Sequence, residues 1–128
     1  MALFGPGQYL RGESAVYAAM DKASPDYHGG LWDYVKTPRG NRYMRPKMAL
    51  AETGYRLIQP QNFSDVRVSA DGAGIAITLL VLNHLAWQLC STKREGAARL
   101  VQANYEALME ELIDSGHRDL LEIRAFLD

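Results

Sequence analysis

The sequence predicts a single small α+β domain, mainly helical, with a short antiparallel β-sheet formed by the middle of the chain. Two patterns lead to this fold class. Short runs that alternate apolar and polar residues, separated by turn formers, occupy residues 31–68. Apolar residues at helical spacing occupy residues 69–127. The chain has 128 residues and is 48% hydrophobic, so we expect one domain with its own core over residues 1–128.

The N-terminal part is predicted to hold an irregular arm and a short helix. Residues 1–12 are rich in glycine and aromatic side chains, which indicates an arm whose apolar residues lie against the rest of the domain. Residues 14–23 place Val16 and Met20 on one helical face, and Pro25 ends that helix.

The middle of the chain carries the strand signals. Residues 31–36 alternate two sets of side chains and are followed by the turn formers of residues 37–41, which predicts a hairpin with residues 42–45. Residues 55–58 and 66–68 are two further short strand candidates.

The C-terminal part is predicted to be helical. Ser69 caps a helix that has Asp71 in its first turn and is apolar on every face over residues 75–89, so this helix should be central and buried. Gly72 and Gly74 should let another backbone pack against its first turn. A capping box at residues 92–95 opens the next helix, Ser115-Gly116 ends it, and residues 117–126 form a last short helix. The side chains expected to be largely buried are Trp32, Tyr34, Val66, Leu79, Leu82 and Leu108.

The overall charge excludes two simple functions. The chain has 14 basic and 15 acidic residues, a net charge of −1. A duplex-DNA binder needs a basic excess to neutralise phosphates, and an imitator of DNA needs a large acidic excess. We therefore expect neither.

Cysteine usage and hydropathy point to the cytoplasm. Cys90 is the only cysteine, which excludes an intrachain disulfide, and it is expected to be buried and inert. The start of the chain lacks the pattern of a signal peptide. The apolar run of residues 75–90 is interrupted by Asn83 and His84 and is shorter than the ~20 residues of a membrane span, so we interpret it as a core helix.

The candidate catalytic and metal-binding residues form no recognisable set. His28, His84 and His117 lack metal-ligand spacing, and His84 is expected to be a core histidine. His28 beside Asp26 and Tyr27 has the make-up of a general base, but no partner nucleophile can be named. We therefore assign no catalytic residue, no metal and no cofactor, and expect a protein that is not an enzyme.

The sequence contains one basic stretch and, further along, one acidic stretch. Residues 36–47 hold five cations and no acid, and the aromatic side chains Trp32, Tyr34 and Tyr43 lie beside or among them. This composition suits single-stranded nucleic acid or an acidic protein face. Residues 104–128 are predominantly acidic, so the chain also suits a protein partner or head-to-tail self-association into a homo-oligomer. The candidate interaction surface consists of Tyr27, Lys36, Arg39, Arg42, Arg45 and Lys47.

Two blocks of sequence carry a family resemblance. The first is aspartate-tyrosine-x-glycine-glycine-x-tryptophan from residue 26, followed by a hairpin that ends in tyrosine-methionine-x-proline at residues 43–46. The second is serine-alanine-aspartate-x-alanine-glycine-isoleucine at residues 69–75. In this order and spacing they resemble the ArdB/KlcA-type antirestriction proteins. The matching positions are Asp26, Tyr27, Gly29, Gly30, Trp32, Tyr43, Pro46, Ser69, Asp71 and Gly74.

The resemblance implies a function that composition does not reveal. Members of this family are α+β proteins of plasmids, prophages and other mobile elements, and they relieve the restriction of incoming DNA by Type I enzymes. The resemblance implies no cofactor and no catalytic residue, and a Type I restriction-modification enzyme or an associated host protein as partner. Arg39, Arg42 and Arg45 depart from the family pattern, so the basic hairpin is peculiar to this chain. A small module that binds single-stranded nucleic acid through residues 36–47 remains the alternative.

Overall fold

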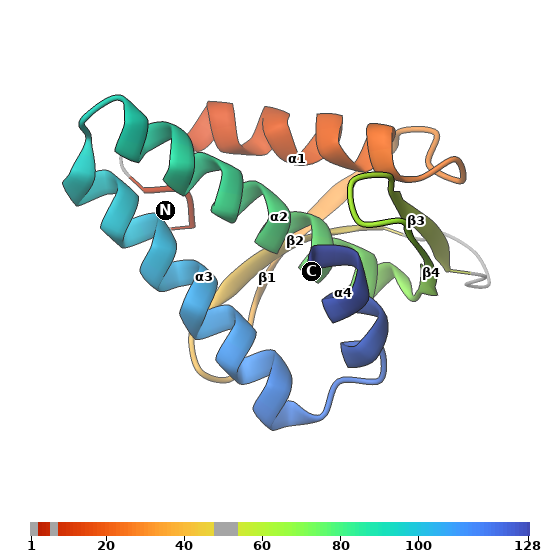
Figure 1. The fold of residues 1–128 in the computed structure, drawn as a ribbon. Helices are drawn as coiled ribbons and strands as arrows, with labels where there is room; N and C mark the ends of the chain where they lie inside the picture. Colours follow the sequence, from red (N-terminus) through yellow and green to blue (C-terminus); the bar gives the residue numbers. More distant parts are fainter. Residues whose placement is uncertain (1–2, 6–7, 48–53) are drawn as a thin grey trace.

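The structure, a computed structural model, describes residues 3–5, 8–47 and 54–128. Its α+β architecture confirms the predicted fold class (Figure 1). The helix α2 runs through the middle of the molecule, with α1 along one side and α3 along the other. The strands pair as two separate antiparallel hairpins, β1 with β2 and β3 with β4. The elements are α1 (Tyr9–Ala23), β1 (Trp32–Lys36), β2 (Arg42–Pro46), β3 (Tyr55–Gln59), β4 (Ser64–Val68), α2 (Ala70–Ser91), α3 (Glu95–Ser115) and α4 (Leu120–Leu127).

The central helix forms as the sequence predicts. Ser69 is its N-cap, and the Ser69 hydroxyl accepts a hydrogen bond from the backbone N–H of Gly72 at 3.0 Å. Leu79 and Leu82 are fully buried. By length and composition alone α2 could cross a membrane, but 67% of its most apolar stretch is buried inside the fold. This burial is typical of the core helix of a globular domain.

The first hairpin lies edge-on against α2. The backbone N–H of Met44 in β2 donates to the hydroxyl of Thr78 at 3.1 Å, so the helix satisfies part of the open edge of the sheet. A Cβ atom on Gly74 would collide with the Met44 carbonyl oxygen and the Arg45 Cα. Gly74 therefore permits the close backbone approach that the sequence predicts.

The second hairpin is tied to the loop that follows α1. The carboxylate of Asp26 accepts the backbone N–H of Arg56 at 2.8 Å and pairs with the Arg67 guanidinium at 3.5 Å. Leu57 of β3 is fully buried in the core. Asp26 thus joins two segments that are far apart in sequence.

The N-terminal arm is shorter than predicted, because α1 begins at Tyr9 rather than at residue 14. The helix includes Gly12, and the missing side chain there makes room for the ring of Phe4, which is 1% exposed. Leu3 is also buried, so the described apolar residues of the arm pack against the body as expected. Burial of Phe4 compensates for the cost of about 1 kcal/mol that glycine imposes inside a helix.

The predicted capping box at residues 92–95 is wrong. The hydroxyl of Thr92 donates to the carbonyls of Gln88 and Leu89, so Thr92 closes α2 instead of opening α3. Lys93 then adopts a left-handed backbone with φ 62°, and α3 starts without a side-chain cap. At its other end α3 stops at Gly116 in the left-handed conformation, as predicted.

Several burial predictions also need correction. Tyr34 is 40% exposed, because it lies on β1 and reaches out to Glu13 of α1, whose carboxylate accepts its hydroxyl at 2.6 Å. His84 and Cys90 are exposed rather than buried, because they lie on the outer side of α2 beyond its packed faces. Trp32 and Val66 are half-buried, whereas Leu108 is buried as predicted.

Candidate functional site

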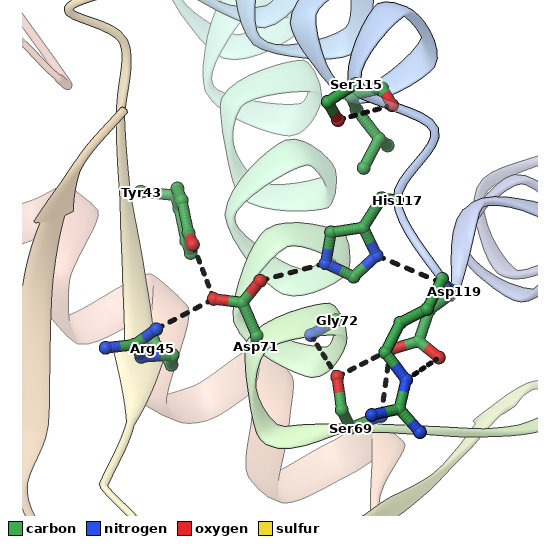
Figure 2. Close-up of polar contacts among 10 residues, drawn as sticks. Tyr43, Arg45, Ser69, Asp71, Gly72, Ser115, His117 and Asp119 are labelled. Atoms are coloured by element: carbon green, nitrogen blue, oxygen red, sulfur yellow. Dashed lines mark hydrogen bonds and ion pairs between the residues drawn. The ribbon is translucent and has the colours of Figure 1, made fainter. Parts of the chain in front are cut away.

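The carboxylate of Asp71 is the centre of a polar cluster at the start of α2 (Figure 2). It accepts hydrogen bonds from the hydroxyl of Tyr43 at 2.5 Å, the guanidinium of Arg45 at 2.9 Å and the imidazole Nε2 of His117 at 2.8 Å. Tyr43 and Arg45 come from β2, and His117 comes from the connection between α3 and α4. Asp71 therefore links three elements that are remote in sequence.

The hydrogen bonds of His117 define its tautomer. Its Nδ1 accepts the backbone N–H of Asp119 at 3.0 Å, so Nδ1 carries no proton. The proton then lies on Nε2 and is donated to Asp71. Both ring nitrogens are occupied, so neither is available to take a proton from a substrate.

A second set of bonds joins Ser69 to Asp119. The backbone N–H and the hydroxyl of Ser69 both donate to one oxygen of Asp119, at 3.0 and 2.6 Å. A Cβ atom on Gly72 would collide with the same carboxylate, so glycine is required for this approach. We refer to these residues as the Asp71 cluster: Tyr43, Arg45, Ser69, Asp71, His117 and Asp119.

The Asp71 cluster contains serine, histidine and aspartate but lacks the hydrogen-bond arrangement of a catalytic triad. In a triad the serine hydroxyl donates to the imidazole, which in turn donates to the aspartate. Here the Ser69 hydroxyl donates to the Asp119 carboxylate, and the imidazole of His117 accepts a backbone N–H. The arrangement therefore holds elements together and does not activate a nucleophile.

The pKa of Asp71 is lowered in this cluster, whereas the pKa of Tyr43 is raised. Burial by itself raises the pKa of Asp71, but the hydrogen bonds from Tyr43, His117 and Arg45 outweigh it and lower the pKa. Burial, and then the hydrogen bond to Asp71, strongly raise the pKa of Tyr43. The cluster is thus built around an ionised Asp71 and a neutral Tyr43.

An open cleft of about 800 Å³, which we refer to as the Asp71 cleft, lies beside the Asp71 cluster. Gly30 on its rim has φ 115° and follows Gly29 with φ 86°, backbone conformations that residues with a side chain rarely adopt. No described atom would contact a Cβ added to either glycine, so the space beside this rim is open. The other lining residues are Leu31, Asp33, Arg45, Pro46, Lys47, Ser69, Ala70, Asp71, His117 and Arg118.

The tip of the first hairpin is docked on α3 by an acidic side chain. Glu111, only 8% exposed, accepts the hydroxyl of Thr37 at 2.5 Å and the amide of Asn41 at 2.7 Å. Arg39 pairs with Asp114 at 2.9 Å. Part of the basic stretch, the hairpin tip, therefore contacts part of the acidic stretch, on α3, within one molecule.

The structure divides the predicted interaction surface. Arg45 and Lys47 line the cleft, where Lys47 pairs with Asp33 at 3.3 Å. Arg39 lies at the tip, and Lys36 and Arg42 are cross-strand neighbours next to the tip. Tyr27 does not join these cations, because it is 9% exposed and its hydroxyl accepts the indole N–H of Trp32 at 3.0 Å.

The residues of the two family blocks lie closer together in the structure than the residues of the predicted interaction surface do. Gly30, Pro46, Ser69 and Asp71 all line the cleft. Tyr43 binds Asp71 from β2, and Gly74 packs against the backbone of that strand. The remaining positions, Asp26, Tyr27, Gly29 and Trp32, shape the segment that leads to the rim of the cleft.

Sequence reasoning missed two members of this site, His117 and Asp119. Their signal was a pair of polar side chains directly after the helix end at Ser115-Gly116, but only the fold places them opposite Ser69 and Asp71. His28 is exposed, and the carboxylate of its neighbour Asp26 is bonded to the second hairpin. Within residues 3–5, 8–47 and 54–128, no group of three or more His, Cys, Asp or Glu side chains is arranged to hold a metal ion.

Comparisons with known proteins identify the class to which this chain and its fold belong. Residues 25–128 match the family model described as antirestriction protein, so the chain belongs to the antirestriction protein family.

Individual relatives agree with this assignment. The chain is 40% identical over 85 residues to the putative antirestriction protein YubI of Escherichia coli strain K12, covering 66% of this chain and 57% of YubI. It is 36% identical over 91 residues to an Escherichia coli antirestriction protein KlcA, covering 70% of this chain and 60% of KlcA. The chain thus spans about three fifths of the length of these curated relatives.

A solved structure from work on KlcA and ArdB superposes with a TM-score of 0.78 and 32% sequence identity. The match covers 98% of this chain and 83% of the other. That work describes a novel fold and antirestriction activity of KlcA and ArdB against Type I DNA restriction systems in vivo but not in vitro.

Proposed function

We propose that this protein relieves Type I restriction of incoming plasmid or phage DNA. The observation that carries the proposal is membership of the antirestriction protein family over residues 25–128. The similarity to the KlcA and ArdB fold over nearly the whole chain supports it. Type I restriction acts on DNA inside the bacterial cell, so the protein would act in the cytoplasm.

We further propose that the protein is not an enzyme and acts through a protein partner, either the Type I enzyme or an associated host protein. The bonding of His117 and Ser69 supports this view, since both side chains are committed to holding the fold. KlcA and ArdB act in vivo but not in vitro. A similar dependence here would mean that a cellular component is required.

The Asp71 cleft is the surface that best suits such a partner. Family positions from both sequence blocks line it, and it combines the exposed Leu31 with the cations Lys47 and Arg118. Arg118 is 81% exposed at its side chain and lies 3.9 Å from Asp119, so it can be replaced without disturbing the core.

The test is the plating efficiency of unmodified phage on hosts with and without a Type I system, with and without this protein. Protection confined to the restricting host is expected. Lys47→Glu and Arg118→Glu should reduce protection, whereas Arg124→Glu on the exposed part of α4 should not. A soluble, folded protein that gives no protection would contradict the proposed function. Equal protection by all three variants would contradict only the choice of surface.

The alternative of single-stranded nucleic-acid binding by residues 36–47 has weaker support. Arg39, Arg45 and Lys47 are each paired with a carboxylate, which lowers their availability for phosphates. The alternative expects a mobility shift of a single-stranded oligonucleotide at low salt that disappears as salt rises. The absence of any shift at low salt would eliminate it.

A further inference from the structure

A groove of about 530 Å³ lies between the C-terminal half of α2 and the N-terminal half of α3, at the opposite end of α2 from Asp71. Trp87 lies on it and is 73% exposed, although the rest of α2 is largely buried. Ala86 and Ala98 are small side chains that leave the groove hollow. We refer to this surface as the Trp87 groove: Asn83, Ala86, Trp87, Cys90, Glu95, Ala98, Arg99 and Gln102.

Two oppositely charged side chains line the Trp87 groove. Glu95 and Arg99 are both exposed, and neither forms an ion pair with any residue in the part of the chain that the structure describes. They lie four residues apart on α3, with Ala98 and Gln102 on the same stripe. The surface therefore carries one acid and one base of equal and opposite charge, next to a protruding indole.

Such a surface is complementary to itself. In a two-fold pair the same patch of both copies meets, so a residue that contacts another is contacted by it in return. Antiparallel packing of α3 against its copy, with the two-fold axis level with residue 97, would place Glu95 opposite Arg99 twice. The indole of each copy would enter the hollow beside the small side chains of the other. An exposed tryptophan next to a matching hollow is the usual composition of an interface centre.

We propose that a second copy of this chain occupies the Trp87 groove and forms a two-fold symmetric dimer. The surface is confined to about half of each helix, so the dimer is small and dissociates on dilution. The Asp71 cleft lies outside this interface, so both copies keep it available.

Sedimentation velocity of the full chain over a range of concentrations tests the proposal. The wild-type sedimentation coefficient should rise with concentration, and Trp87→Ala should weaken association by about tenfold or more. Leu121→Ala, which removes another highly exposed apolar side chain away from the groove, should leave association unchanged. A reducing agent is present throughout, so that a disulfide between exposed Cys90 side chains does not imitate the dimer.

Charge reversal tests the two-fold register. Glu95→Arg and Arg99→Glu should each weaken association by about threefold or more, because each places like charges opposite one another twice. The double variant Glu95→Arg/Arg99→Glu should restore it. A wild-type protein that is monomeric up to about 1 mM overturns the proposal. So does a dimer that survives Trp87→Ala, or a double variant that fails to recover although circular dichroism shows it folded.

Discussion

The Asp71 cluster and the Trp87 groove lie at opposite ends of α2 and differ in how far their side chains are bonded to the rest of the fold. At the start of α2 the carboxylate of Asp71 accepts hydrogen bonds from three side chains, and Ser69 is bonded to Asp119. Near its end Trp87 is exposed, and the neighbouring Glu95 and Arg99 have no ion-pair partner among the described residues. The first region is built for stability of the fold, and the second is left open for contact.

The largest effect is expected at Gly74. In Gly74→Ala the new methyl group meets the backbone of β2, which cannot move away as a side chain can, so we expect a loss of about 3 kcal/mol in the free energy of unfolding. Gly96→Ala on α3 is the matched control, because no described atom lies within 4 Å of its added Cβ. The control should be neutral or stabilising by up to about 1 kcal/mol. Urea denaturation of both variants measures the difference, and equal stabilities would refute the close backbone packing.

Removal of Asp71 should have the next largest effect. Asp71→Ala leaves the buried hydroxyl of Tyr43 and the imidazole of His117 without their acceptor, so we expect a loss of about 2–3 kcal/mol. Glu95→Ala in the Trp87 groove should cost the monomer less than about 1 kcal/mol, because Glu95 contributes only as an exposed acid in the first turn of α3. Denaturation at low protein concentration separates the two variants. Similar losses would contradict the contrast between the two regions.

Acid should destabilise the protein through the same carboxylate. The folded-state pKa of Asp71 lies below its unfolded value, so its contribution to stability is present above the unfolded pKa of about 3.9 and is lost as pH falls through the folded pKa. The pKa of Glu111 is lowered as well: its burial raises the pKa, and the bonds from Thr37, Asn41 and the Arg39 backbone more than offset this. The melting temperature should therefore drop below about pH 4, and less steeply in Asp71→Asn.

A small effect on stability is expected at the exposed ion pair of the hairpin tip. Arg39→Ala removes a pair with Asp114 in which both side chains are about half exposed, so the loss should be only about 0.2–1 kcal/mol. Glu111→Gln, at the buried neighbour of this pair, should cost more, since Glu111 accepts two side-chain donors. Thermal melts of both variants in low and high salt check the order. Only the Arg39 effect should fade as salt rises.

The sequence was most informative where a local pattern has a local cause. The cap at Ser69, the turn between β1 and β2 and the left-handed end at Gly116 each depend on a few adjacent residues, and all three were predicted. Two local predictions failed for different reasons. Gly12 continues a helix because Phe4, from the preceding arm, packs on it. Thr92 closes α2 because its hydroxyl bonds the last carbonyls of that helix, an alternative to the capping box that the same residues also allow.

By itself the sequence determined the α+β class, the central apolar helix and, through its two blocks, the family to which the chain belongs. The tertiary structure alone decided which side chains meet. His117 and Asp119 follow Asp71 and Ser69 by 46 and 50 residues, and nothing local predicts that these pairs share hydrogen bonds. The exposure of Trp87 could not be predicted either. A tryptophan in an apolar helix is expected to be buried until the positions of the neighbouring elements are known. The physical reason is the same in both cases: hydrogen bonding and burial depend on distances in space, and the chain encodes these only through its whole fold.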